Sequence, residues 1–300
     1  MFIDIHVHTR SIPGPPRRGK QAYATPEQLL ERYDAIGVEA GVLLPGVSPE
    51  CSHAPQSNQE ILQICEAHPG RFIPFCNVDP RSMTNSSDAP LGELLDFYRE
   101  QGCKGIGEVT ANLPFRNPMV QNLFRHAERA ELPLTFHMAA QLGGIYGLYD
   151  EPGLPQLERS LAAFPSLVFL GHSQTFWAEM GRLEKPGDRY GYPSYPIHEE
   201  GVVPRLFRQY PNLYGDLSAN SGCNALKRDP EYALRFLEEF QDRLLFGTDI
   251  CAPDTPTPLV DLLLELRKDG KLSETVFEKV SRGNAVRLLN LPTKGLEKPV

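Results

Sequence analysis

The chain alternates eight times between a short apolar stretch and a longer amphipathic stretch, and this repeat limits the folds open to it. The apolar stretches have the composition of strands buried on both faces of a parallel sheet. They begin near residues 2, 39, 72, 103, 133, 167, 212 and 244. Units of this spacing predict an α/β fold, a (β/α)8 TIM barrel formed as a single domain over residues 1–300. A doubly wound open sheet is the competing architecture, because strand count alone does not prove closure.

The stretches between these strands have residues typical of helix ends and apolar residues at helical spacing. Thr25 and Pro26 have the residue types of an N-cap and a first helical position, and Gly37 marks the end of that helix. Apolar spacing predicts further helices at 59–68, 91–101, 118–130, 156–163, 199–210, 230–240, 259–268 and 274–289.

The first strand ends in two histidines. In an extended strand His6 and His8 lie on one face, and Ile3, Ile5 and Val7 point to the other. Two imidazoles so placed can bind one metal ion, although a His-x-His pair can also simply end a strand.

Other strand ends carry residues of the same chemistry, and they decide between these readings. They are Glu108 on the fourth strand, His137 on the fifth, His172 on the sixth and Asp249 on the eighth. The carboxyl ends of all strands meet at one mouth of a barrel, so these side chains converge on one point. Imidazoles and carboxylates predict a divalent ion, most simply zinc, with manganese or iron as alternatives.

The composition of the chain limits the classes of molecule that it is expected to bind. With 38 acidic and 30 basic side chains the formal net charge is -8, which disfavours nucleic acid and favours a small-molecule substrate. The six cysteines show no C-x-x-C spacing, which predicts a reduced, cytoplasmic setting. Nothing in the sequence indicates export or membrane insertion. A homo-oligomer would be unsurprising.

The sequence resembles the amidohydrolase superfamily and, within it, the amidohydrolase-related group of metal-dependent barrel enzymes. The resemblance spans nearly the whole chain. Its motifs are Asp4-Ile5-His6-Val7-His8, Phe136-His137, Gly171-His172-Ser173, Phe246-Gly247-Thr248-Asp249 and Gly283-Asn284-Ala285-Val286-Arg287-Leu288-Leu289. The resemblance implies that His6, His8, His137 and Asp249 surround a metal, and that His172 is a further ligand or polarises substrate or water.

Glu108 bears on the number of ions. Two-metal members of the superfamily often place a carboxylated lysine on the fourth strand, where this chain has Glu108. A glutamate there resembles the TatD-type metal-dependent DNases, although Val109-Thr110-Ala111-Asn112 lacks the Gly-Leu-Asp run of that family. One ion and two ions both remain open.

The expected activity is metal-dependent hydrolysis of a small molecule by a metal-activated water. Asp249 would exchange the proton of that water, His172 would stabilise the oxyanion, and Glu108 would complete the site. The first alternative is a non-oxidative decarboxylase of the aminocarboxymuconate-semialdehyde decarboxylase type, and a TatD-like DNase is the second.

Candidates for substrate contacts are fewer. Arg10 and Arg116 could each receive a substrate carboxylate, although a loop arginine such as Arg10 is as often part of a surface ion pair. Trp177 could line the mouth or anchor a packed loop. Asp216 ends the seventh strand, where it could reach the site or hold loop backbone, and we favour the second role. Cys251 is expected to be a small buried filler without an adjacent base.

Overall fold

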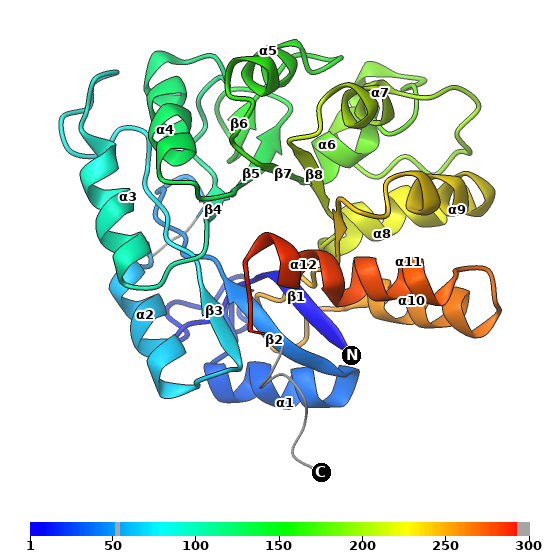
Figure 1. Ribbon diagram of the computed structural model, residues 1–300, viewed down its shortest axis with the longest axis horizontal. Coiled ribbons are helices and arrows are strands. Elements are labelled where there is room, and N and C mark those ends of the chain that lie inside the picture. Colours follow the sequence, from blue (N-terminus) through cyan, green and yellow to red (C-terminus); the bar gives the residue numbers. More distant parts are fainter. Residues whose placement is uncertain (52–54, 293–300) are drawn as a thin grey trace.

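Eight parallel strands form a ring enclosed by helices in the computed structural model, which describes residues 1–51 and 55–292 (Figure 1). The strands of the ring are β1 (Phe2–Val7), β2 (Val38–Leu43), β3 (Phe72–Pro74), β4 (Ile106–Val109), β5 (Leu134–Ala139), β7 (Phe169–His172), β8 (Leu213–Asp216) and β9 (Leu244–Leu245). A further short strand, β6 (Leu148–Tyr149), pairs with the end of β5.

The ring is closed at both places where its two sheets meet. One sheet has the order β1-β2-β3 and the other β4-β5-β7-β8-β9. The first junction is a parallel bridge between Cys76 and Ile106, where Gly107 N donates to Cys76 O at 2.9 Å. At the second junction Val7 pairs with Ile250 in parallel beyond the end of β9. The predicted barrel is therefore confirmed, and the open doubly wound sheet is excluded.

The helices follow the strands in the predicted alternation. They are α1 (Pro26–Ile36), α2 (Asn58–Ala67), α3 (Leu91–Glu100), α4 (Pro118–Arg129), α5 (Pro155–Ala163), α6 (Gln174–Ala178), α7 (Val202–Gln209), α8 (Ala219–Lys227), α9 (Pro230–Glu239), α10 (Pro258–Lys268), α11 (Glu274–Glu278) and α12 (Asn284–Leu288). A 3₁₀ turn η1 (Pro186–Tyr190) precedes α7, and a π-helical turn η2 (Lys279–Gly283) joins α11 to α12. Among the described residues, no helix is long and apolar enough to cross a membrane.

Local sequence explains where α1 begins and ends. Gln28 N donates to Thr25 Oγ1 at 3.3 Å, and Thr25 N donates to Gln28 Oε1 at 3.0 Å, which together form a capping box. Gly37 ends the helix with a φ of 75°, a left-handed conformation that favours glycine. Helices α6 and α8 were not predicted. Helix α6 has only five residues, too few to show a helical repeat, and α8 contains Ser, Gly and Asn residues, which favour loops.

The apolar core has two parts. The larger part lies between the strands and the helices. A smaller cluster contains Ile3, Ile5, Val42 and Leu170, and it fills the barrel interior because it joins β1 and β2 to β7, which is not their neighbour in the ring. Val7 belongs to the outer part, so the prediction that it shares a face with Ile3 and Ile5 was wrong. The cause is a register irregularity between Asp4 and Val7 in β1.

Candidate metal centre

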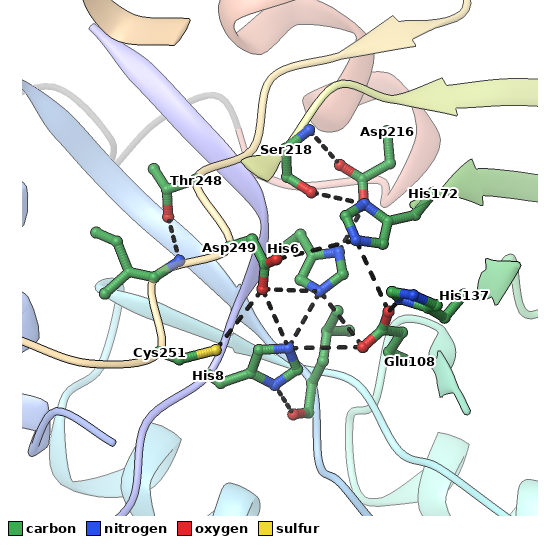
Figure 2. Close-up of polar contacts among 12 residues, drawn as sticks. His6, His8, Glu108, His137, His172, Asp216, Ser218, Thr248, Asp249 and Cys251 are labelled. Atoms are coloured by element: carbon green, nitrogen blue, oxygen red, sulfur yellow. Dashed lines mark hydrogen bonds and ion pairs between the residues drawn. The ribbon is translucent and has the colours of Figure 1, made fainter. Parts of the chain in front are cut away.

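The six predicted ligands lie together at the mouth of the barrel, as Figure 2 shows. Their donor atoms fall into overlapping groups whose members lie within 4.8 Å of one another. The ligands come from several strands of the barrel. His6 lies on β1 and His8 directly follows that strand, whereas Glu108 lies on β4, His137 on β5 and His172 on β7. Asp249 follows β9, and its position is fixed because Asp249 N donates to His6 O at 2.8 Å.

Each histidine of the first strand is held through its Nδ1 atom. His6 Nδ1 donates to Asp216 Oδ2 at 2.6 Å, and both side chains are fully buried. His8 Nδ1 donates to the carbonyl oxygen of Leu44 at 2.8 Å. These bonds direct both Nε2 atoms to the same point, and a ligating histidine is typically held by such a bond from its other nitrogen.

The two Nε2 atoms face each other at 3.1 Å, and two carboxylate oxygens face the same point. Glu108 Oε2 lies 3.8 Å from His6 Nε2 and 3.7 Å from His8 Nε2. Asp249 Oδ1 lies 3.6 Å from each of the two Nε2 atoms. Ligands about 2.1 Å from one ion are about 3.0 Å apart at a right angle and about 3.6 Å apart at 120°.

This arrangement fits a divalent ion. Two imidazole nitrogens and two carboxylate oxygens converge, and a divalent ion between them would offset the negative charge of the carboxylates. The donor types are those that zinc and other divalent first-row metals accept.

His137 and His172 lie on the far side of Glu108. His137 Nδ1 is 2.7 Å from Glu108 Oε1, a hydrogen-bond distance shorter than the spacing of two ligands on one ion. His172 Nε2 is 3.8 Å from Glu108 Oε1 and 3.9 Å from Asp249 Oδ2, and its Nδ1 is 3.0 Å from Ser218 Oγ. Glu108, His137 and His172 also form a group with metal-ligand spacing.

Burial and charge shift the acid–base behaviour of these groups. Burial raises the pKa of Asp249 to about 7, with the carboxylates of Glu108 and Asp216 adding to that rise. Burial alone would lower the pKa of His6, but the adjacent Asp216 carboxylate raises it to about 10. Burial lowers the pKa of His172 to about 3. Burial would raise the pKa of Glu108, but His137 holds it well below its usual range.

A second carboxylate network fixes the two chain segments that carry ligands. Asp4 Oδ1 accepts bonds from His6 N at 3.0 Å and Thr248 N at 2.9 Å, and Asp4 Oδ2 accepts from the Tyr33 hydroxyl at 2.7 Å. Burial raises the pKa of Asp4 to about 6. Asp4 therefore ties β1 to the segment before Asp249 and sets their relative position.

Three sequence-based interpretations are corrected. Trp177 is buried in the core, where its Nε1 donates to Asp216 O at 2.8 Å, so it does not line the mouth. Arg116 is exposed before α4, where it donates to Gln121 Oε1, and it is absent from the cavity wall. Asp216 does bond loop backbone, through Ser218 N at 2.9 Å, but it also holds His6 and thus belongs to the site.

A cavity that is open to solvent adjoins the cluster. His8, Glu108, His137 and Asp249 form its floor. Its walls include Arg10, Arg17, Tyr23, Cys51, Gln56, Thr110, Tyr146 and Cys251.

Of these wall residues, Arg10 was predicted and two tyrosines were missed. The Arg10 guanidinium lies 4.4 Å from the centre of the Tyr23 ring. The Tyr146 ring lies 4.5 Å from the His137 ring and is partly exposed to the cavity. Both tyrosines lie in loops, and no sequence pattern distinguishes them from other loop tyrosines.

Comparison with known proteins now identifies the family. The amidohydrolase family model matches residues 3–291. This chain belongs to the amidohydrolase family. A curated relative, 2-pyrone-4,6-dicarboxylate hydrolase of Comamonas testosteroni, is 26% identical over 278 residues, which are 86% of this chain and 79% of the relative.

Solved structures agree on the fold. An uncharacterised TIM-barrel protein of Bordetella bronchiseptica matches with a TM-score of 0.63 and 17% identity, covering 96% of this chain and 98% of that one. A dihydroxybenzoic acid decarboxylase of Polaromonas sp. JS666, solved with bound manganese and the inhibitor 2-nitroresorcinol, matches with a TM-score of 0.59 and 16% identity, covering 97% of both chains.

The family match confirms the predicted resemblance and the prediction of an enzyme. It agrees with the main reading, a metal-dependent hydrolase acting on a small molecule.

Proposed function

We propose that this chain hydrolyses a small carboxylated ester or lactone at one divalent ion, most simply zinc. His6, His8, Glu108 and Asp249 would hold the ion. The observation that carries this proposal is the pair of His6 and His8 Nε2 atoms, which face each other at 3.1 Å while each Nδ1 atom is engaged by an acceptor. Because each Nδ1 donates to an acceptor, Nε2 is the atom that each neutral ring can offer to a metal ion.

When bound, a divalent ion polarises a carbonyl group and lowers the pKa of adjacent water to about 7. The chain supplies the remaining steps. Asp249 presents Oδ1 to the ion position and Oδ2 towards His172, so it can take a proton from water and return it to the leaving oxygen. His172 Nε2 lies 3.8 Å from Glu108 Oε1 and 3.9 Å from Asp249 Oδ2, and it would donate a hydrogen bond to the oxyanion that develops on the substrate. His137 orients Glu108 through their 2.7 Å contact.

The cavity wall supports a substrate with negative charge. Arg10 and Arg17 line the wall, and the ligand cluster forms the floor. A guanidinium group binds a carboxylate through two parallel hydrogen bonds, which would orient the substrate with its reactive carbonyl towards the floor. The similar Comamonas protein is named for a pyrone dicarboxylate, which is a cyclic ester with carboxylate groups, and this agrees with the same substrate class.

Metal analysis tests the centre. We expect about one equivalent of zinc or manganese per chain in the native protein, its loss in His6→Ala, and its retention in His198→Ala, a control at an exposed histidine. About two equivalents, with one lost in His137→Ala, would establish a two-ion site. Protein that takes up no metal on titration would refute the proposal.

Product analysis tests the reaction. We expect ring opening or ester hydrolysis with a panel of carboxylated lactones and esters, dependent on metal and lost in Asp249→Asn. Release of carbon dioxide from carboxylated aromatic acids, without hydrolysis of any ester, would instead establish the decarboxylase alternative. Metal-dependent cleavage of DNA would establish the nuclease alternative.

The remaining expectations are also proposals. A single domain over residues 1–300 agrees with the closed barrel. A cytoplasmic location agrees with six cysteines that are all unpaired in the described part of the chain. We also propose a homo-oligomer, which sedimentation would test.

A further inference from the structure

Cys251 lies at the rim of the metal centre, two residues after Asp249, and the mechanism above does not use it. Its Sγ atom is 3.8 Å from Asp249 Oδ1, and Figure 2 shows the sulfur pointing towards that carboxylate. The donor atoms of His8, Asp249 and Cys251 all lie within 4.8 Å of one another. The thiol also lines the cavity wall, so the sequence-based view of Cys251 as a buried filler was wrong.

We propose that Cys251 Sγ is an additional, soft ligand of the metal centre, binding the ion from the cavity side when no substrate is present. This inference rests on the proposed function, because it requires an ion among His6, His8, Glu108 and Asp249. Coordination by Cys251 would make the site prefer zinc and cadmium to manganese. The substrate would have to displace the Cys251 sulfur in order to reach the ion.

The geometry fits sulfur coordination. A zinc ion about 2.3 Å from sulfur and about 2.1 Å from oxygen, at the angle of about 120° between two equatorial ligands of a five-coordinate site, sets those two atoms about 3.8 Å apart. The Cys251 Sγ to Asp249 Oδ1 distance of 3.8 Å is close to this value. The four proposed ligands and sulfur would make five, a number that zinc in catalytic sites can reach.

The backbone around Cys251 fixes its position. Cys251 N donates to Thr255 Oγ1 at 3.3 Å, and Cys251 O accepts from Ala24 N at 2.6 Å. The first bond lies within the loop of Cys251 itself, and the second ties that loop to Ala24, whose carbonyl oxygen accepts from Arg10 N at 3.1 Å. The side chain therefore extends from a fixed backbone to within 4.8 Å of the donor atoms of His8 and Asp249.

The chemistry of the step is simple. The Cys251 thiol gives up its proton to solvent as sulfur binds, and no electron is transferred. A thiolate favours zinc and cadmium over manganese, whereas the carboxylates suit manganese as well. A substrate carbonyl or water arriving through the cavity competes with sulfur for the same side of the ion.

Cys51 provides a matched control. It lines the same cavity, but its Sγ donates to Ser48 O at 3.3 Å and accepts from Thr110 Oγ1 at 3.2 Å. Within the described residues it belongs to no group with metal-ligand spacing.

The test is a cobalt titration of metal-free native protein, Cys251→Ser and Cys51→Ser. Cobalt bound to sulfur gives a charge-transfer absorption in the near ultraviolet, and bound cobalt of any ligand set gives visible bands. We expect both absorptions in the native protein and in Cys51→Ser. In Cys251→Ser we expect the visible bands alone, with the preference for cadmium over manganese reduced about tenfold.

The outcomes separate the two proposals. Visible bands without the near-ultraviolet absorption in the native protein would overturn the inference about Cys251 and leave the metal centre standing. Near-ultraviolet absorption that persists in Cys251→Ser and disappears in Cys51→Ser would assign the sulfur to Cys51 and also overturn it. No cobalt bands in native protein would overturn the metal centre and this inference together. X-ray absorption at the zinc edge of the native holoprotein needs no variant, and it should find one sulfur neighbour at about 2.3 Å.

Discussion

Replacing Asp216 by asparagine removes one of two acceptor oxygens from the deepest part of the metal centre. In the native protein Oδ2 accepts from His6 Nδ1 at 2.6 Å, and Oδ1 accepts from Ser218 N at 2.9 Å. Asparagine has one oxygen and one NH2 group, so it can serve either His6 or Ser218 and must turn a donor towards the other. Asp216 and His6 are both fully buried, so water cannot replace the missing acceptor.

The size of the effect follows from that loss. A buried donor without an acceptor costs about 1–3 kcal/mol. If the loss falls on His6, the ring is no longer held with Nε2 towards the ion, and residues that orient a ligating histidine contribute about 10–100-fold to metal affinity. These two estimates agree, because each tenfold change in affinity corresponds to about 1.4 kcal/mol. We therefore expect Asp216→Asn to bind zinc about 10–100-fold more weakly than native protein.

Competition with a chromophoric chelator measures the affinity, and thermal unfolding of the metal-free proteins reports any general loss of stability. Asp150→Asn is the matched control. Asp150 is fully buried and accepts from Gln156 N at 3.0 Å and Leu157 N at 2.7 Å, at the start of α5 and outside the ligand cluster. The Asp150→Asn protein should be less stable than native protein and should keep the native zinc affinity. An Asp216→Asn protein with native zinc affinity would refute the argument that Asp216 orients His6.

Further predictions concern pH, substrate charge and packing. In the metal-free protein the pKa is about 7 for Asp249 and about 10 for His6, so both groups hold protons near neutrality that a metal must displace. Zinc affinity should therefore fall about 100-fold or more between about pH 8 and about pH 6, because the proton on His6 alone accounts for about tenfold per pH unit. Calorimetry in two buffers would measure the proton release, and a pH-independent affinity would contradict this prediction. Arg10→Ala should raise KM for a carboxylated substrate about tenfold or more with a smaller change in kcat, and should leave KM for an uncharged ester unchanged. Trp177→Phe removes the bond from Nε1 to Asp216 O and should cost about 1–2 kcal/mol of unfolding free energy in urea, while metal content stays native.

The sequence predicted which ligand-type residues lie together, because all strands of a barrel end at the same mouth. Glu108, His172 and Asp249 are far apart in the chain, but every strand ends at the same mouth, so their convergence needs only the strand positions. The strands themselves were visible as apolar stretches between Gly and Pro residues. Asp216 obeyed the same rule, but an Asp at a strand end can also bond loop backbone, and its bond to His6 was therefore missed.

Side-chain direction could not be read in the same way. Trp177 follows a strand end, but the unpredicted helix α6 turns it away from the mouth and into the core against Phe236. The irregularity in β1 likewise separates Val7 from Ile3 and Ile5, although an ideal strand would keep them on one face. Both outcomes depend on packing against residues remote in sequence, which no local pattern contains.

The positions of the ligands and of the cavity wall are determined by different parts of the chain, and this affects which substrate can bind. Ligand positions follow from strands, and strands follow from local composition. The wall is built from loops whose conformation depends on distant backbone. Arg10 is placed by its bond to Ala24, and Ala24 is placed by its bond to Cys251 at the other end of the chain. A substitution in the loop of residues 250–255 can thus shift Arg10 and Cys251 together without touching a ligand. Substrate preference and metal selectivity should change together in such variants, whereas the binding of an ion by His6 and His8 should persist.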